Sequence, residues 1–344
     1  MRLPALALTF ALAGLASARD PEWGGLGAVA VSPDGKTVVT GGASRVLYVL
    51  DAASMDVKSR IWIRARVGGL VFSRDGSRLF LEDDEETVHV YETAGWTETL
   101  TVADCGEIQA APEGDLLVAI GSRPKPSVRF LSLSDGSDRG RVEVEGRIAL
   151  VGIDPAGKTA FVLHDPAADA AEPKADRAAM PKDLKRAGQA EWQQRNDGQM
   201  ATIRWIDVAG LKATGDAKLW YTARSGAHAF VRDGVATVVT YEDLCARITA
   251  KGEVSTFEVT GSYNYGRGSS GDRTWIAGGG LRHGALLGPD GAARKFEVDA
   301  LPGWPEYWGG FTFGPDGTCW GVTSAFRLVR ISKDGKVEKT VPVF

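Results

Sequence analysis

The chain has 344 residues and a formal net charge of −4. This weak acidity argues against a general surface for nucleic acid or for anionic lipid, because such surfaces need clustered Lys and Arg. Hydrophobic residues make up 44% of the chain and glycines number 43, which together indicate a globular, turn-rich protein.

The first 18 residues are typical of a secretory signal peptide. An apolar run follows Arg2 and ends near Leu15, and Ala16 and Ala18 form an A-x-A cleavage site. The run is shorter than the about 20 apolar residues of a spanning helix, so we predict no membrane span. We expect a mature chain that begins near Arg19 and is periplasmic or secreted. The alternative is an N-terminal helix of the mature fold.

A Pro-Asp-Gly type of turn recurs along the rest of the chain. The copies are SPDG at 32–35, SRDG at 73–76, APEG at 111–114, DPAG at 154–157, VRDG at 231–234 and GPDG at 314–317, with a degraded SSGD at 269–272. The first four glycines are separated by 41, 38 and 43 residues, and a period near 40 is typical of a propeller blade. The longer step from Gly157 to Gly234 indicates one blade plus an insertion.

Each turn lies between two strand-like runs, and two more runs follow it. The first unit reads GAVAVS, KTVVTGG, RVLYVLD and KSRIWI, and such β-branched runs bounded by Gly, Asp and Pro predict a four-stranded antiparallel sheet. Seven units can be read in this way. We therefore predict an all-β fold in which residues 19–344 form a single seven-bladed β-propeller. We also expect the protein to be a monomer. The last unit has four strands of its own, so the ring needs no strand exchange with the N-terminus.

These units resemble the blades of bacterial WD-repeat and YVTN-type β-propellers, from about Trp23 to Phe344. The resemblance implies the fold and says little about function, since propellers carry many unrelated activities. The chain also departs from the WD-repeat consensus. No unit has the Gly-His pair, and the Trp-Asp dipeptide survives only loosely, for example as Leu50-Asp51.

The insertion in blade four spans about 165–199 and is predicted to be partly helical. Within it, the segment KDLKRAGQAEWQQR places Leu184, Ala187 and Trp192 roughly on one side, as in a short amphipathic helix. A solvated loop is the alternative. The strand order puts second-to-third strand loops and blade-to-blade links on the face opposite the Pro-Asp-Gly turns. Ligand surfaces in repeat folds gather where insertions map, so Trp192 is a candidate binding residue.

Aromatic side chains are densest near the last link. Trp304, Tyr307 and Trp308 lie in LPGWPEYWGG, and Tyr263 and Tyr265 lie near the first strand of the preceding blade, blade six. Such a group could stack on a sugar or a peptide, or it could pack between blades six and seven. The acidic run EDDEE at 82–86 could bind a cation or a basic partner, although charge runs are usually solvated loops.

The sequence favours binding over catalysis. It contains no GxSxG, HExxH or CxxCH motif, and the first strands of the blades contribute one His and no carboxylate. We therefore predict no metal site and no cofactor, and we expect a binding or scaffold module for an unknown protein or carbohydrate partner. The alternative is a lactonase- or hydrolase-like propeller with a channel-mouth site at His164, His228, Glu242 and Asp243.

The three cysteines, Cys105, Cys245 and Cys319, are far apart and lack the spacing of a thiolate metal site. They fall in blades three, five and seven, which are not neighbours, and a disulfide requires Cα atoms within about 7 Å. We therefore expect buried free thiols.

Overall fold

The computed structural model describes residues 24–165, 179–184, 188, 189, 192, 200–220, 228–239, 245–257, 266–303 and 305–344. The predicted signal peptide and most of the insertion lie outside this part. Of the predicted helix in the insertion, Gly188, Gln189 and Trp192 are described and have helical backbone, and no helix is delimited in the described chain. The described residues also contain no helix with the length and apolar character needed to cross a membrane.

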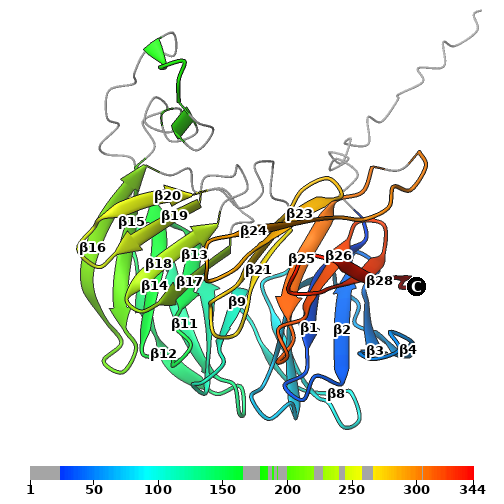
Figure 1. Cartoon of the computed structure of the whole chain (residues 1–344). Helices are drawn as coiled ribbons and strands as arrows, with labels where there is room; N and C mark the ends of the chain where they lie inside the picture. Colours follow the sequence, from blue (N-terminus) through cyan, green and yellow to red (C-terminus); the bar gives the residue numbers. More distant parts are fainter. Residues whose placement is uncertain are drawn as a thin grey trace, which may run out of the picture.

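The chain folds into seven four-stranded antiparallel sheets, which confirms the predicted all-β, seven-bladed propeller (Figure 1). Blades one and two contain β1 (Leu26–Val31), β2 (Thr37–Gly42), β3 (Val46–Asp51), β4 (Val57–Trp62), β5 (Val67–Phe72), β6 (Arg78–Asp83), β7 (Val88–Glu92) and β8 (Thr97–Val102). Blades three and four contain β9 (Gly106–Ala111), β10 (Leu116–Gly121), β11 (Ser127–Ser132), β12 (Asp138–Glu143), β13 (Arg147–Ile153), β14 (Thr159–Asp165), β15 (Met200–Asp207) and β16 (Lys212–Trp220).

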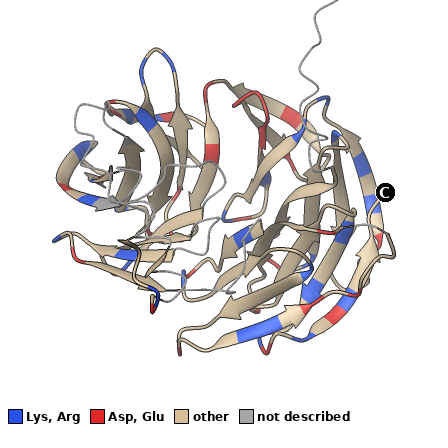
Figure 2. Cartoon of the chain, turned by 90° about the horizontal axis from the view of Figure 1, so that it is seen from above, with Lys and Arg blue, Asp and Glu red and all other residues tan. Residues whose placement is uncertain are grey.

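Blades five, six and seven complete the ring. Their strands are β17 (His228–Arg232), β18 (Val235–Val239), β19 (Cys245–Thr249), β20 (Val254–Phe257), β21 (Gly266–Ser269), β22 (Ile276–Gly279), β23 (His283–Leu287), β24 (Ala293–Glu297), β25 (Trp308–Phe313), β26 (Cys319–Thr323), β27 (Arg327–Ile331) and β28 (Val337–Pro342). Seen from above, the sheets are placed around a central axis, and both signs of charge occur on several blades (Figure 2).

The recurring turn joins the first and second strands of a blade. In blade one, the Gly35 N–H donates to the Ser32 carbonyl at 2.8 Å, and the Asp34 carboxylate accepts from the Ser32 hydroxyl at 2.6 Å and from the Lys36 N–H at 3.0 Å. Gly35 has a φ of 71°, a conformation that glycine adopts without strain. The conformation of the turn is therefore determined by its own residues. This explains why the turn can be recognised in the sequence of blade after blade.

Blade six has the same turn in a different register from the one predicted. Ser270 and Asp272 take the positions of Ser32 and Asp34, with the Ser270 hydroxyl 2.5 Å from the Asp272 carboxylate. Arg273 then stands where the other turns have glycine, with a φ of 59°. The SSGD segment at 269–272 is thus one residue early, and the residue in the left-handed conformation is an arginine.

Neighbouring blades pack through buried side chains on both faces of each sheet. One core cluster joins blade one to blade seven and includes Leu26, Val38, Trp320 and Val322. The outermost strands are more exposed, as β8 shows, because one of their edges and part of each face lie at the surface. The core therefore forms a ring of apolar layers around the axis, rather than a single central core.

The ring closes without strand exchange, as predicted. Blade seven consists of β25, β26, β27 and β28 alone, and blade one lies directly against it. The inner strands approach so closely here that a Cβ atom on Gly309 would collide with the Leu26 carbonyl oxygen. At the outer edge, the Arg60 guanidinium donates to the Phe344 carbonyl at 2.7 Å. Packing and side-chain hydrogen bonds thus hold this seam.

Candidate functional site

The inner strands of the blades enclose a central channel that holds a cavity of about 570 Å³. The first strand of each blade is an edge strand of its sheet and lies innermost in the ring. The backbone N–H and C=O groups on its free edge therefore face the axis. Most of the lining is Gly, Ala and Val. The polar side chains among the lining residues come from blades two, three, five, six and seven: Glu82, Glu107, Gln109, His228, Arg267, Ser269, Arg273 and Thr312.

Two carboxyl groups lie at the link end of the channel, which we define as the end opposite the recurring turns. Glu82 stands near the end of β6, and its two oxygens accept the N–H groups of Glu107 at 2.8 Å and Ile108 at 3.1 Å. Burial raises the pKa of Glu82, against the effect of these two hydrogen bonds. Glu107 stands near the start of β9, with a φ of 51°, and Glu82 holds it there through the backbone.

The Glu107 carboxyl is in a distinctive electrostatic position. Its side chain reaches water within the channel, yet protein surrounds the group. This enclosure, together with the negative charge of Glu82, raises the pKa of Glu107 to about 7, although the positive charge of Arg267 opposes the shift. A carboxyl group with a pKa near neutrality exchanges protons readily at physiological pH.

Two arginines and a histidine line the other part of the channel. Arg267 is the second residue of β21, and Arg273 extends from the blade-six turn. The Arg273 guanidinium donates to the Ser269 hydroxyl at 3.1 Å and to the Ala110 carbonyl at 2.6 Å. Because Ala110 belongs to blade three, Arg273 spans the channel near its turn end.

His228, the first residue of β17, is hydrogen-bonded to the same serine. Its Nε2 lies 2.9 Å from the Ser269 hydroxyl oxygen. Burial and the positive charges of Arg273 and Arg267 lower the pKa of His228 to about 3. The imidazole is therefore neutral at pH 7. The pair has the separation of a nucleophile and its base, but the lowered pKa makes His228 a weak acceptor of a proton.

Gln109 connects three blades beside the channel. Its side-chain oxygen accepts the Ile153 N–H of blade four at 2.9 Å, and its Nε2 donates to the Ala229 carbonyl of blade five. The Gln109 side chain thus provides hydrogen-bond partners for a backbone N–H on the free edge of β13 and for a backbone carbonyl on the free edge of β17. Gln109 and Arg273 together occupy the turn end of the channel.

The predicted site residues fall into separate places. His228 lines the channel, whereas His164 is 2% exposed in β14, where its Nδ1 lies 2.8 Å from the Glu145 carbonyl. Glu242 and Asp243 lie outside the described residues. Of the four residues of the hydrolase alternative, the structure therefore describes only the two histidines, and they lie in different surroundings.

The aromatic group is likewise divided. Trp308 is 1% exposed and packs against Phe296 and Phe311, with ring centroids 5.3 and 4.8 Å away. This cluster joins blades six and seven, so the packing alternative accounts for Trp308. Tyr307 is half-buried beside it and forms a β-bridge with Leu281. The other members, Tyr263, Tyr265 and Trp304, lie outside the described residues, and Trp192 is half-buried with helical backbone.

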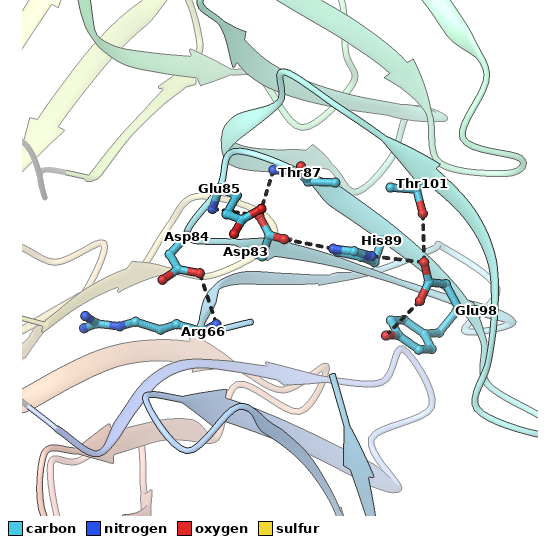
Figure 3. Close-up of polar contacts among 9 residues, drawn as sticks. Arg66, Asp83, Asp84, Glu85, Thr87, His89, Glu98 and Thr101 are labelled. Atoms are coloured by element: carbon cyan, nitrogen blue, oxygen red, sulfur yellow. Dashed lines mark hydrogen bonds and ion pairs between the residues drawn. The ribbon is translucent and has the colours of Figure 1, made fainter. Parts of the chain in front are cut away.

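The acidic run at 82–86 is largely bound by the chain itself (Figure 3). The Asp83 carboxylate accepts the N–H groups of Glu85 and Thr87 at 2.9 Å each, and its other oxygen lies 3.0 Å from His89 Nε2. The Asp84 carboxylate accepts the Arg66 N–H at 3.1 Å. These contacts shape the loop between β6 and β7.

His89 lies between two carboxylates. On its other side, Nδ1 is 3.1 Å from Glu98 Oε1, which also accepts the Thr101 hydroxyl at 2.8 Å. Partial burial disfavours the imidazolium, but the bonds to Asp83 and Glu98 outweigh it and raise the pKa of His89. Within the described chain, no group of three or more His, Cys, Asp or Glu side chains is placed to hold a metal ion.

Sequence reasoning missed the charged channel residues. The expectation that the first strands carry no carboxylate is wrong, because Glu107 belongs to β9 and lines the channel. Arg267 lies in the first strand of blade six, β21, and sequence reasoning gave it no role. Aligning the blades on their turns would have revealed both residues. Glu82 and Arg273 reach the channel from outside the inner strands, and no local pattern marks them.

Comparison with known proteins shows the fold. No protein-family model matches the chain, and no curated protein matches it. Among the solved structures that match is hydrazine synthase from Kuenenia stuttgartiensis, with a TM-score of 0.60 and 15% sequence identity over 93% of this chain and 96% of that one. At this identity the likeness shows a seven-bladed β-propeller and nothing further.

Proposed function

We propose that this propeller is a binding protein that holds a small ligand in its central channel. The observation that carries the proposal is the concentration of charged and polar side chains in a cavity whose walls are otherwise Gly and apolar residues. Burying charge is costly, and a ring that served only as a scaffold would be more stable with an apolar filling. The polar groups are therefore better explained by something they bind.

The same geometry favours binding over the hydrolase alternative. Ser269 and His228 have a suitable separation of 2.9 Å, but a general base must take up a proton during attack. His228 is poorly suited to this, because Arg273 and Arg267 stand beside it and its pKa lies near 3. The hydroxyl also accepts a hydrogen bond from Arg273, which fixes the serine as part of a polar network.

A panel of small probes tests the proposal. The melting temperature is measured with sodium acetate, ethylammonium chloride and glycerol, because a ligand that binds the folded state stabilises it by RT ln(1 + [L]/Kd). The matched variant is Gly68→Phe, which places a ring at the link end. A Cβ there meets nothing closer than the Glu82 carboxylate at 3.5 Å, so the variant should fold.

We expect at least one probe to raise the melting temperature of the wild type and to have a much smaller effect on Gly68→Phe. Equal shifts in the two proteins would place binding elsewhere. The absence of any shift in the wild type would contradict a channel site for small ligands.

We also propose that the protein is exported to the periplasm or secreted, and that it belongs with the WD-repeat and YVTN-type propellers that its blades resemble. Support for export comes from the apolar run and the Ala16-Ser17-Ala18 segment. We expect cleavage after Ala18, and intact-mass measurement of protein from the cell envelope checks it. A mass that includes Met1 would contradict export by this route.

A further inference from the structure

We propose that the channel binds a small monocarboxylate anion between Arg267 and Arg273, with Ser269 and His228 beside it. This inference rests on the proposed channel function and names its ligand class. It is carried by an unbalanced buried cation, by the residues around it and by the charges at the two ends of the cavity.

Arg273 is a buried cation that forms no ion pair with a carboxylate of the described chain, although the charges of Asp272 and Asp154 act on it from a distance. Its residue is 8% exposed, and the two hydrogen bonds from its guanidinium go to neutral oxygens, those of Ser269 and Ala110. Its Nε has no hydrogen-bond partner among the described residues. The carboxylate next to it in sequence, Asp272, instead accepts from Ser270 and Thr274.

A buried guanidinium without a carboxylate is unfavourable unless an anion completes it. Burial lowers the pKa of Arg273 to about 10, which leaves it charged at pH 7. Arg267 lines the same cavity and adds a second positive charge on the same blade. The cavity therefore attracts an anion toward blade six.

The carboxyl groups at the link end limit which anion fits. Glu82 accepts two N–H groups through both of its oxygens, as an ionised carboxylate does. A carboxylate at this end of the cavity repels further negative charge. A monovalent anion is therefore favoured over a divalent phosphate or a dicarboxylate, which would bring a second negative charge toward Glu82.

Chemistry favours a carboxylate among monovalent anions. Its two coplanar oxygens accept guanidinium N–H groups in a matched geometry, and its remaining lone pairs can accept from a hydroxyl or an imidazole N–H. The small apolar residues that make up most of the cavity lining leave room for a short apolar tail. We therefore assign the site to a carboxylate with few carbon atoms.

Proton linkage gives this assignment a specific signature. The groups that act on Glu107 are Glu82, which opposes its ionisation, and Arg267, which favours it. A bound anion between the arginines adds a further negative charge, so binding should favour protonated Glu107. The affinity for the anion should then fall as the pH rises through about 7, by roughly fivefold if the repulsion is that of partly screened charges.

Calorimetric titration of the full chain with sodium acetate tests the inference, with sodium chloride to hold the ionic strength constant. A ligand of so few atoms is expected to bind in the millimolar range. We expect acetate to bind about tenfold more weakly to Arg267→Gln, and Glu107→Gln to bind acetate with the same affinity at pH 6 and pH 8. Arg139→Gln, an exposed arginine of blade three that pairs with Asp115, is the matched control and should bind as the wild type does.

Arg273→Gln should also lose acetate binding, but this variant removes the contact between blades six and three as well, so Arg267→Gln decides the question. Acetate affinity that is unchanged in Arg267→Gln, or chloride that competes as well as acetate, would overturn the carboxylate site. If ethylammonium or glycerol binds in the channel and acetate does not, this inference fails while the proposed function stands. If none of the three binds, both fail.

Discussion

Arg273 of blade six donates a 2.6 Å hydrogen bond to the carbonyl of Ala110 in blade three, although the two residues lie on opposite sides of the ring. The residue that makes this contact occupies the last position of the recurring turn, where the other six blades have glycine, in five of them with a positive φ. A single substitution in a repeating turn has thus placed a charge across the channel. Arg273 thus has two effects that can be measured separately. Its hydrogen bond to Ala110 bears on stability, and its positive charge bears on what the channel binds.

Gln109 should contribute to stability through blades four and five. Gln109→Ala leaves the Ile153 N–H and the Ala229 carbonyl without their present partners, and we expect the free energy of unfolding to fall by about 2 kcal/mol. Urea denaturation measures it, with the exposed Lys125→Ala as control. A loss no greater than that of the control would mean that water replaces the amide at no cost.

The close approach of inner strands predicts a sharp contrast between two glycines. A Cβ on Gly268 would collide with the Phe311 carbonyl oxygen of the next blade, whereas a Cβ on Gly215 of β16 would meet nothing within 4 Å. We expect Gly268→Ala to destabilise the fold by about 3 kcal/mol or more, and Gly215→Ala to change it by less than about 0.5 kcal/mol. Similar melting temperatures for the two variants would contradict the packing described for blades six and seven.

His89 should stabilise the protein more at low pH than at high pH. Its folded pKa is raised above the ordinary value of 6.5, so its contribution is fully present below pH 6.5 and is lost as the pH rises through the folded pKa. We expect His89→Gln to cost about 1 kcal/mol at pH 6, and less at pH 9. Chemical denaturation at the two pH values provides the comparison, and a cost that grows with pH would be inconsistent with the paired imidazolium.

His228 should have the opposite effect. Its folded pKa of about 3 lies below the ordinary 6.5, so the unfolded chain takes up a proton in this window and the folded chain does not. The wild type should therefore lose stability as the pH falls from 6.5 toward 3, by up to about 1.4 kcal/mol per pH unit. His228→Gln should lack this component, whereas His283→Gln, at an exposed position, should retain it. Parallel acid profiles for the two variants would count against a buried neutral imidazole.

The cysteines should be chemically silent in the folded protein. Cys105, Cys245 and Cys319 are free and buried, as predicted, and burial raises the pKa of Cys105 to about 11 and also raises that of Cys319. A thiol reagent at pH 8 should label none of them in the native state and all three after denaturation. Rapid native labelling would indicate local opening of the blades that contain them.

The sequence predicted the ring because its signals are local. The Ser32 to Gly35 turn is held by hydrogen bonds within five residues, so each copy can be recognised alone and its period counted. The channel is different, because Glu82, Gln109 and Arg273 meet there only after separate blades have closed. Glu82 illustrates the difficulty in physical terms, because it belongs to a second strand and becomes a channel residue by binding the backbone of the next blade.

The four strands of every blade follow one another directly in strand order along the chain, including those of the two blades at the seam. The seam between blades one and seven is therefore chemically of the same kind as the other six junctions, and no blade depends on a strand from the opposite terminus. The order in which the blades follow one another along the chain matters, but the blade that comes first does not. A circularly permuted chain that joins the present ends by a flexible linker and opens at another blade junction should form the same ring.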